Sequence, residues 1–229
     1  MAGTNSGDMD IKNYRNRSEW MNRKKRGLSF LMMAAFLFLA SNAHSAPKTV
    51  LVLGDSLSAE YGLVRGTGWV ALLESKIKAE NFNAQIINAS ISGDTTSGGE
   101  SRLPALLKKH RPSVVVIELG GNDGLRGLPL STVEANLRTM IATAKNARAK
   151  VLLIGIRLPP NYGRKYGAQF AEMYGKVARD TKSALVPFLL NGFADRPDMF
   201  QTDGIHPKAE AQSIMLDNAW PHLKPLLKQ

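Results

Sequence analysis

The chain of 229 residues contains no cysteine. This absence excludes a disulfide framework, a thiolate metal site and a cysteine nucleophile. It also excludes a lipoprotein signal, because lipid attachment needs a cysteine at the cleavage point. Aromatic residues make up only 7% of the chain, and they are not interleaved with the basic residues behind the net charge of +11. A solvated basic surface explains that pattern, so we expect no nucleic-acid partner.

The N-terminal region also lacks an apolar run long enough to span a membrane. Leu28–Ala40 is apolar over about 13 residues, whereas a spanning helix needs about 20. The basic cluster Arg23–Arg26 precedes this run, and the small residues Ser41–Ala46 follow it. That order is typical of a secretory signal peptide.

The signal peptide sets the expected organisation of the chain. We expect residues 1–46 to be an N-terminal extension with the signal peptide, and 47–229 to be a single domain. After cleavage the protein would be periplasmic or secreted, with no stable membrane anchor. No coiled-coil heptads are present, so we expect a monomer.

Apolar runs alternate with segments of helical periodicity along the rest of the chain. Strands are expected at residues 49–53, 85–89, 114–119, 151–156 and 185–187. Continuous apolar runs are typical of strands buried on both faces, and their alternation with helices indicates a parallel sheet. The predicted fold class is α/β, a three-layer α/β/α sandwich around a five-stranded parallel sheet.

Local signals predict where three helices begin. Ser97 with Glu100 has the spacing of a capping box, and so has Ser131 with Glu134. Pro207 suits the first position of a helix, which predicts that the last helix begins there.

The sheet also predicts where function lies. In parallel sheets, ligands bind outside the carboxyl ends of the strands. The candidate segments follow the first four strands, at residues 54–58, 90–97, 120–127 and 157–163.

Ser56 is the candidate nucleophile, in the sequence Gly54-Asp55-Ser56 after the first strand. Gly54 permits a sharp turn that presents the hydroxyl at the sheet edge. A serine hydroxyl attacks only when a neighbouring base takes its proton. Taken alone, the segment is weak evidence, and an ordinary Asx or Ser turn is the favoured interpretation.

Elimination among the four histidines finds the base. His44 lies in the signal region, His110 in a basic helix end and His222 in the C-terminal tail. His206 follows Asp203 by three residues, so the carboxylate can orient the imidazole as in a catalytic triad. His206 as merely the residue before a proline stays open, whereas a metal site is disfavoured because zinc needs three protein ligands.

An acyl-transfer site also needs donors for an oxyanion. The backbone N–H groups of Ser56 and Gly93 and the side-chain amide of Asn122 are candidates, each placed after a different strand. Singly, each segment reads as a Gly or Asn turn. Together they form a set of donors at the predicted functional edge.

These residues resemble the signature blocks of the GDSL/SGNH hydrolases. The blocks are Gly54-Asp55-Ser56-Leu57, Gly93, Gly121-Asn122-Asp123 and the Asp203–His206 pair, in family order across residues 49–222. Longer stretches resemble the periplasmic multifunctional thioesterase I/lysophospholipase subfamily, whose members are also called arylesterases. One departure is Glu60, where a glycine is expected, and it puts substrate preference in doubt.

The resemblance implies a flavodoxin-like sandwich, the SGNH hydrolase fold, and hydrolysis of esters and thioesters without cofactor or metal. Its implied substrates are aryl esters, acyl thioesters and lysophospholipids, cleaved through an acyl-enzyme on Ser56. We expect Leu125, Leu128, Leu158 and Tyr162 to line the acyl groove, simple loop packing being the alternative.

Two rival functions remain open. A carbohydrate O-deacetylase uses the same machinery on short acyl groups. A binding module would use residues 54–58 as a phosphate cradle, but the chain lacks both a P-loop and a Gly-x-Gly-x-x-Gly motif after the first strand.

Overall fold

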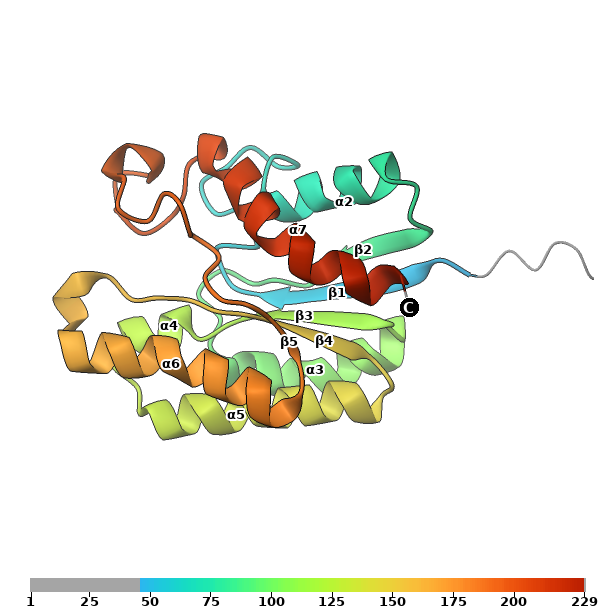
Figure 1. The fold of residues 1–229 in the computed structure, drawn as a ribbon, viewed down its shortest axis with the longest axis horizontal. Coiled ribbons are helices and arrows are strands. Elements are labelled where there is room, and N and C mark those ends of the chain that lie inside the picture. The colour runs from blue at the N-terminus through green and yellow to red at the C-terminus, as the bar shows by residue number, and fades with distance from the viewer. Residues whose placement is uncertain (1–45, 229) are drawn as a thin grey trace, which may run out of the picture. The chain divides into compact units, whose positions relative to one another are not determined.

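The computed structural model describes residues 46–228, and its centre is a sheet of five parallel strands (Figure 1). The strand order is β2-β1-β3-β4-β5. Their bounds are β1 Lys48–Gly54, β2 Ala84–Asn88, β3 Val114–Glu118, β4 Lys150–Ile154 and β5 Ala184–Val186. The predicted α/β class and five-stranded parallel sheet are confirmed, with strand ends that differ by one or two residues.

Helices cover both faces of the sheet, with α2 and α7 on one face and α3, α5 and α6 on the other (Figure 1). The α-helices are α2 Trp69–Ala79, α3 Thr96–His110, α4 Gly121–Leu125, α5 Leu130–Asn146, α6 Arg164–Thr181 and α7 Gln212–Lys228. Short 3₁₀ turns lie at Pro160–Tyr162, Pro197–Met199 and Ala209–Ala211.

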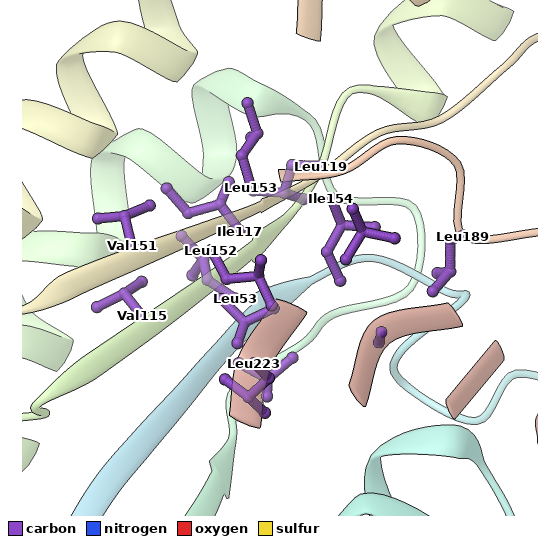
Figure 2. Close-up of a cluster of buried hydrophobic side chains, with 14 of the residues drawn as sticks. Leu53, Val115, Ile117, Leu119, Val151, Leu152, Leu153, Ile154, Leu189 and Leu223 are labelled. Atoms are coloured by element: carbon purple, nitrogen blue, oxygen red, sulfur yellow. The ribbon is translucent and has the colours of Figure 1, made fainter. Parts of the chain in front are cut away.

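The core forms on both faces of the central strands because most of their residues are valine, isoleucine or leucine. Every residue of β3 is buried. Figure 2 shows part of this core, with Leu53 of β1, Ile117 of β3 and Leu223 of α7 among its labelled residues. The strand order in turn sets the positions of the loops after the strands.

The predicted helix starts are wrong. Helix α3 begins at Thr96, and its N-cap is Thr95, whose hydroxyl accepts from the N–H of Gly98 across 3.3 Å. Asp123, from another segment, accepts from the N–H and the hydroxyl of Thr96, so a distant carboxylate sets the start of this helix. Ser97 lies inside the helix instead of capping it.

The other two starts differ for local reasons. Helix α5 begins at Leu130 after an N-cap at Pro129, so Ser131 lies in its first turn and makes no cap. Pro207 forms an antiparallel bridge with Phe200, and α7 begins only at Gln212. Because this bridge keeps Pro207 extended, a helix cannot begin there.

The predicted N-terminal extension, residues 1–46, falls outside the described part of the chain except for Ala46, so the signal peptide and the domain boundary stay predictions. Within residues 46–228, no helix has both the length and the apolar character needed to cross a membrane.

Candidate active site

Ser56 lies in a tight turn that begins where β1 ends. The Asp55 carbonyl accepts from the N–H of Ser58 and of Ala59, at 3.2 and 2.9 Å. The Asp55 carboxylate accepts from the Leu57 N–H across 3.0 Å, so backbone and side chain of one residue hold the turn. Gly54 precedes it because a Cβ there would lie 2.8 Å from both Glu118 Oε2 and Ser58 Oγ.

His206 joins the Ser56 hydroxyl to the Asp203 carboxylate. Its Nε2 lies 2.9 Å from Ser56 Oγ, and its Nδ1 lies 2.7 Å from Asp203 Oδ2. The structure therefore brings the three predicted residues together across 150 positions of sequence. In this arrangement the imidazole can take the serine proton while the carboxylate holds the ring.

The Asp203 carboxylate is held in its charged form. Burial alone would raise its pKa, but the N–H and the ring of His206 together with the N–H of Ile205 donate to it and hold the pKa at about 2. The two backbone bonds are 3.0 and 2.9 Å long. A permanent negative charge beside Nδ1 favours the tautomer with its proton there, which leaves Nε2 free to accept.

The segment that carries His206 is a small antiparallel turn. The Gln201 N–H donates to the His206 carbonyl across 2.8 Å, and Gly204 closes the turn with a φ of +67°. A left-handed φ of this kind is adopted readily only by glycine. The bridge between Phe200 and Pro207 completes the turn, so the imidazole is fixed before α7 begins.

The predicted oxyanion donors lie on loops that contact the nucleophile turn. Gly93 has a φ of +81° and its added Cβ would meet open space, so its backbone borders solvent. The Asn122 amide donates to Asp55 Oδ2 across 3.1 Å and to the Asp94 carbonyl across 3.0 Å. Asn122 thus links the residue before Ser56 to the residue after Gly93, and both amide hydrogens are engaged in this structure.

Arg102 of α3 anchors the loop that carries Gly93, a role that the sequence analysis did not predict. Its guanidinium donates to Asp94 Oδ2 across 2.8 Å, and also to the carbonyls of Ala89 and Gly54. Because one planar group meets three acceptors, it ties the loop after β2 to the end of β1. In the sequence, only the position of Arg102 on the sheet-facing side of its helix could have indicated this role.

Glu118, at the end of β3, was also missed. Its Oε2 accepts from the Ser58 hydroxyl across 2.7 Å and from the Asp55 N–H across 3.3 Å. Among the described residues, its Oε1 has no hydrogen-bond partner. Burial, and then the negative charge of Asp55, raise the pKa of Glu118 well above its usual range. In the sequence, an acidic residue at the end of an otherwise apolar strand could have indicated this role.

Asp55 is the second buried carboxyl behind the nucleophile. Burial raises its pKa to about 6, although the Leu57 N–H, the charge of His206 and the Asn122 amide act in the opposite direction. Because like charges repel, the neighbouring carboxyls of Asp55 and Glu118 are disfavoured from both being ionised.

The four predicted groove residues lie on two adjacent segments. Leu125 ends α4, and Tyr162 ends the 3₁₀ turn after β4. Leu158 packs over Gly124, where an added Cβ would lie 2.6 Å from its Cδ2. The Leu128 carbonyl accepts from the Tyr166 hydroxyl across 2.9 Å. All four side chains are half-buried, so the acyl groove stays a prediction beside plain loop packing.

Groups of acidic and histidine side chains that could hold a metal ion are not found within residues 46–228.

Comparison with known proteins gives a consistent result. A model of the GDSL-like lipase/acylhydrolase family matches residues 52–214. Esterase TesA of Pseudomonas aeruginosa is 49% identical over 199 residues, covering 87% of this chain and 99% of the relative. Thioesterase 1/protease 1/lysophospholipase L1 of Escherichia coli (strain K12) is 44% identical over 192 residues, covering 84% and 91%.

A solved structure agrees with these relatives. The psychrotrophic esterase EstA from Pseudoalteromonas sp., in a structure inhibited by monoethylphosphonate, is 41% identical with a TM-score of 0.75. The match covers 80% of this chain and 100% of that one.

Proposed function

Because the chain belongs to the GDSL-like lipase/acylhydrolase family, we propose that its serine esterase activity runs through an acyl-enzyme on Ser56. The single observation that carries this assignment is His206, which lies within hydrogen-bond distance of both Ser56 Oγ and Asp203 Oδ2. A serine with no base is a poor nucleophile, and this one has a base that is itself oriented by a charged carboxylate.

Acylation follows from that geometry. Ser56 Oγ attacks the acyl carbonyl carbon while its proton passes to His206 Nε2. The tetrahedral intermediate then collapses, the bond to the leaving oxygen breaks, and His206 returns the proton to that oxygen. Asp203 stabilises the imidazolium that exists between these two transfers.

Deacylation runs the same steps in reverse order, with water in place of the leaving group. A water molecule occupies the place of the leaving group, and His206 takes its proton as the water attacks the acyl carbon. The carboxylic acid leaves, and the proton returns to Ser56 Oγ. No cofactor enters either half of the reaction.

The oxyanion would be held by the backbone N–H groups of Ser56 and Gly93 and by the Asn122 amide. Removal of one such donor typically lowers the rate by about 10²–10³-fold. Asn122 already donates to Asp55 and Asp94, so its donation to the oxyanion requires one of those bonds to be shared or lengthened. The bond to Asp55, beside the nucleophile, is the longer of the two.

The substrate class proposed for this chain is aryl esters, acyl thioesters and lysophospholipids. The names of its relatives support ester and thioester hydrolysis, as they include an esterase and a thioesterase/lysophospholipase. Leu125, Leu128, Leu158 and Tyr162 are the proposed walls of the acyl groove. The apolar and basic N-terminal pattern supports export to the periplasm or beyond, with an active monomer after cleavage.

The experiment is hydrolysis of C2 to C16 p-nitrophenyl and acyl-CoA esters by the wild type, Ser56→Ala and Ser75→Ala. Ser75 is exposed on α2 and serves as the matched control. Ser56→Ala should lose turnover and fluorophosphonate labelling, whereas Ser75→Ala should keep both. Activity confined to the C2 esters would favour the deacetylase, and a wild type that neither turns over nor labels would favour the phosphate-binding module.

A further inference from the structure

Tyr61 lies directly against the ring of His206. The ring centroids are 4.3 Å apart, and the planes are tilted by 36°. The Tyr61 side chain is nevertheless 50% exposed, so only part of the ring is covered by the histidine. A large aromatic surface beside the base is thus open to a ligand.

The Tyr61 backbone is hydrogen-bonded to the nucleophile turn and to the turn that carries His206. Its N–H donates to the Ser56 carbonyl across 3.4 Å, and its carbonyl accepts from Gln201 Nε2 across 2.9 Å. Ser56 belongs to the nucleophile turn and Gln201 to the turn that carries His206. The position of the ring is therefore tied to the two reacting groups.

Glu60 closes the loop that carries this tyrosine. Its carboxylate accepts from the Gly66 N–H across 3.0 Å and from the Gly68 N–H across 2.8 Å. Its own φ is +61°, a left-handed conformation that suits the glycine expected at this position. The departure from the family pattern thus adds a carboxylate clasp to the loop between residues 60 and 68.

Exposed large apolar side chains within residues 46–228 are Tyr61, Val64, Ile91 and Ile205. Each lies on a loop at the carboxyl ends of the strands, and two of them lie on the clasped loop. An exposed apolar surface beside a reaction centre favours a role in ligand binding over a role in packing.

The proposed mechanism indicates which part of the substrate lies near Tyr61. His206 Nε2 must return its proton to the leaving oxygen, which therefore lies within about 3 Å of that nitrogen in the reacting complex. A group attached to this oxygen passes next to the ring that packs on His206. Because Tyr61 packs on the ring that carries this nitrogen, its exposed surface is within reach of the leaving group.

We propose that Tyr61 is a specificity-determining residue that stacks on aromatic leaving groups, and that Glu60 is its positioning residue. The inference rests on the proposed acyl-enzyme mechanism and assigns one wall of that site. Offset or tilted stacking of two rings contributes a preference of about threefold to tenfold.

The test compares phenyl butyrate with trifluoroethyl butyrate, which give the same butyryl-enzyme. Wild type, Tyr61→Ala and Tyr61→Phe are assayed for kcat/KM on both esters and for deacylation by a rapid-mixing burst. For Tyr61→Ala, kcat/KM should fall about threefold to tenfold further on the phenyl ester than on the other. Tyr61→Phe should keep the wild-type ratio, and deacylation should not depend on which ester was used.

Equal losses on the two esters for Tyr61→Ala would overturn the proposal, because a displaced His206 slows every ester and deacylation as well. A wild type inactive on both esters would instead contradict the acyl-enzyme mechanism itself. The two failures are therefore distinguishable.

Glu60→Gly tests the clasp, since glycine readily adopts the left-handed backbone and removes the side chain that carries the carboxylate. It should reduce the phenyl preference mainly through a higher KM for the phenyl ester. Glu74→Gln, on the exposed face of α2, removes one negative charge elsewhere and should leave the ratio unchanged. An unchanged ratio in Glu60→Gly would show that the tyrosine does not need the clasp.

Discussion

The backbone N–H of Asp55 donates to Glu118 Oε2 across 3.3 Å, which joins the nucleophile turn to the end of β3. The Ser58 hydroxyl donates to the same oxygen, and the Trp69 indole N–H in turn donates to that hydroxyl across 3.2 Å. A buried carboxyl whose pKa burial raises well above its usual range thus accepts both bonds.

Glu118→Gln should therefore be tolerated, because glutamine has the shape and charge of the protonated acid. Glu118→Leu should lower the free energy of unfolding by about 1–3 kcal/mol or more, since the Asp55 N–H and the Ser58 hydroxyl lose their acceptor in the interior. Urea unfolding of both variants measures the difference. If Glu118→Gln is as damaging as Glu118→Leu, the carboxyl is ionised in the folded protein.

The strands and the residues at their carboxyl ends could be predicted because both depend on short-range patterns. Val114–Glu118 reads as a buried strand whatever lies around it, and Ser56, Asp203 and His206 lie in short segments of recognisable composition. The link between Ser56 and His206 was inferred from chemistry, since only one histidine remained beside a suitable carboxylate.

The remaining features depend on groups that meet only in the folded chain. Asp123 sets the start of α3, although nothing near Thr96 in the sequence indicates it. Glu118 and Arg102 act through acceptors and donors from other strands and loops. Such long-range polar contacts override local capping signals, which explains why the start predicted at Ser97 is wrong.

The pKa shifts of two aspartates predict opposite effects of pH on stability. Asp55 has its pKa raised from 3.8 to about 6, so its contribution is full below 3.8 and is lost as pH rises through 6. Asp203 has its pKa lowered from 3.8 to about 2, so its contribution is present above 3.8 and is lost as pH falls toward 2.

Asp55→Asn should consequently flatten the loss of stability between pH 3.8 and about 6. The free energy of unfolding in urea, measured at several pH values for wild type and variant, gives the two slopes. Parallel curves across that window would contradict the raised pKa. Asp195→Asn, at an exposed position, is the control for the removal of one acidic group.

Asp203→Asn should lower kcat by about 10²–10⁴-fold, because an amide does not hold the proton on Nδ1 as a carboxylate does. Stability near neutral pH should change little, since Asp203 is exposed and surface interactions with charges are weak. Steady-state kinetics measures the loss, and Asp198→Asn is the control, because the Asp198 carboxylate pairs with Arg196. An equal effect of the two substitutions would remove Asp203 from the mechanism.

Arg102→Lys should lower kcat by roughly tenfold to a hundredfold, a smaller loss than the removal of an oxyanion donor. Lysine keeps the positive charge, but its single nitrogen cannot reach Asp94 and the carbonyls of Ala89 and Gly54 together. The loop that carries Gly93 then shifts against the nucleophile turn, so the transition state is affected more than substrate binding. KM should therefore change less than kcat.

Arg138→Lys is the matched control, because Arg138 on α5 pairs with Glu134 and Asp180 and contacts none of the active-site residues described above. Kinetics on one ester with both variants, together with fluorophosphonate labelling, separates the two effects. Arg102→Lys should still label, since Ser56 and His206 remain in place. A change in KM with kcat unaltered, or the same result for both variants, would mean that Arg102 does not position the Gly93 loop.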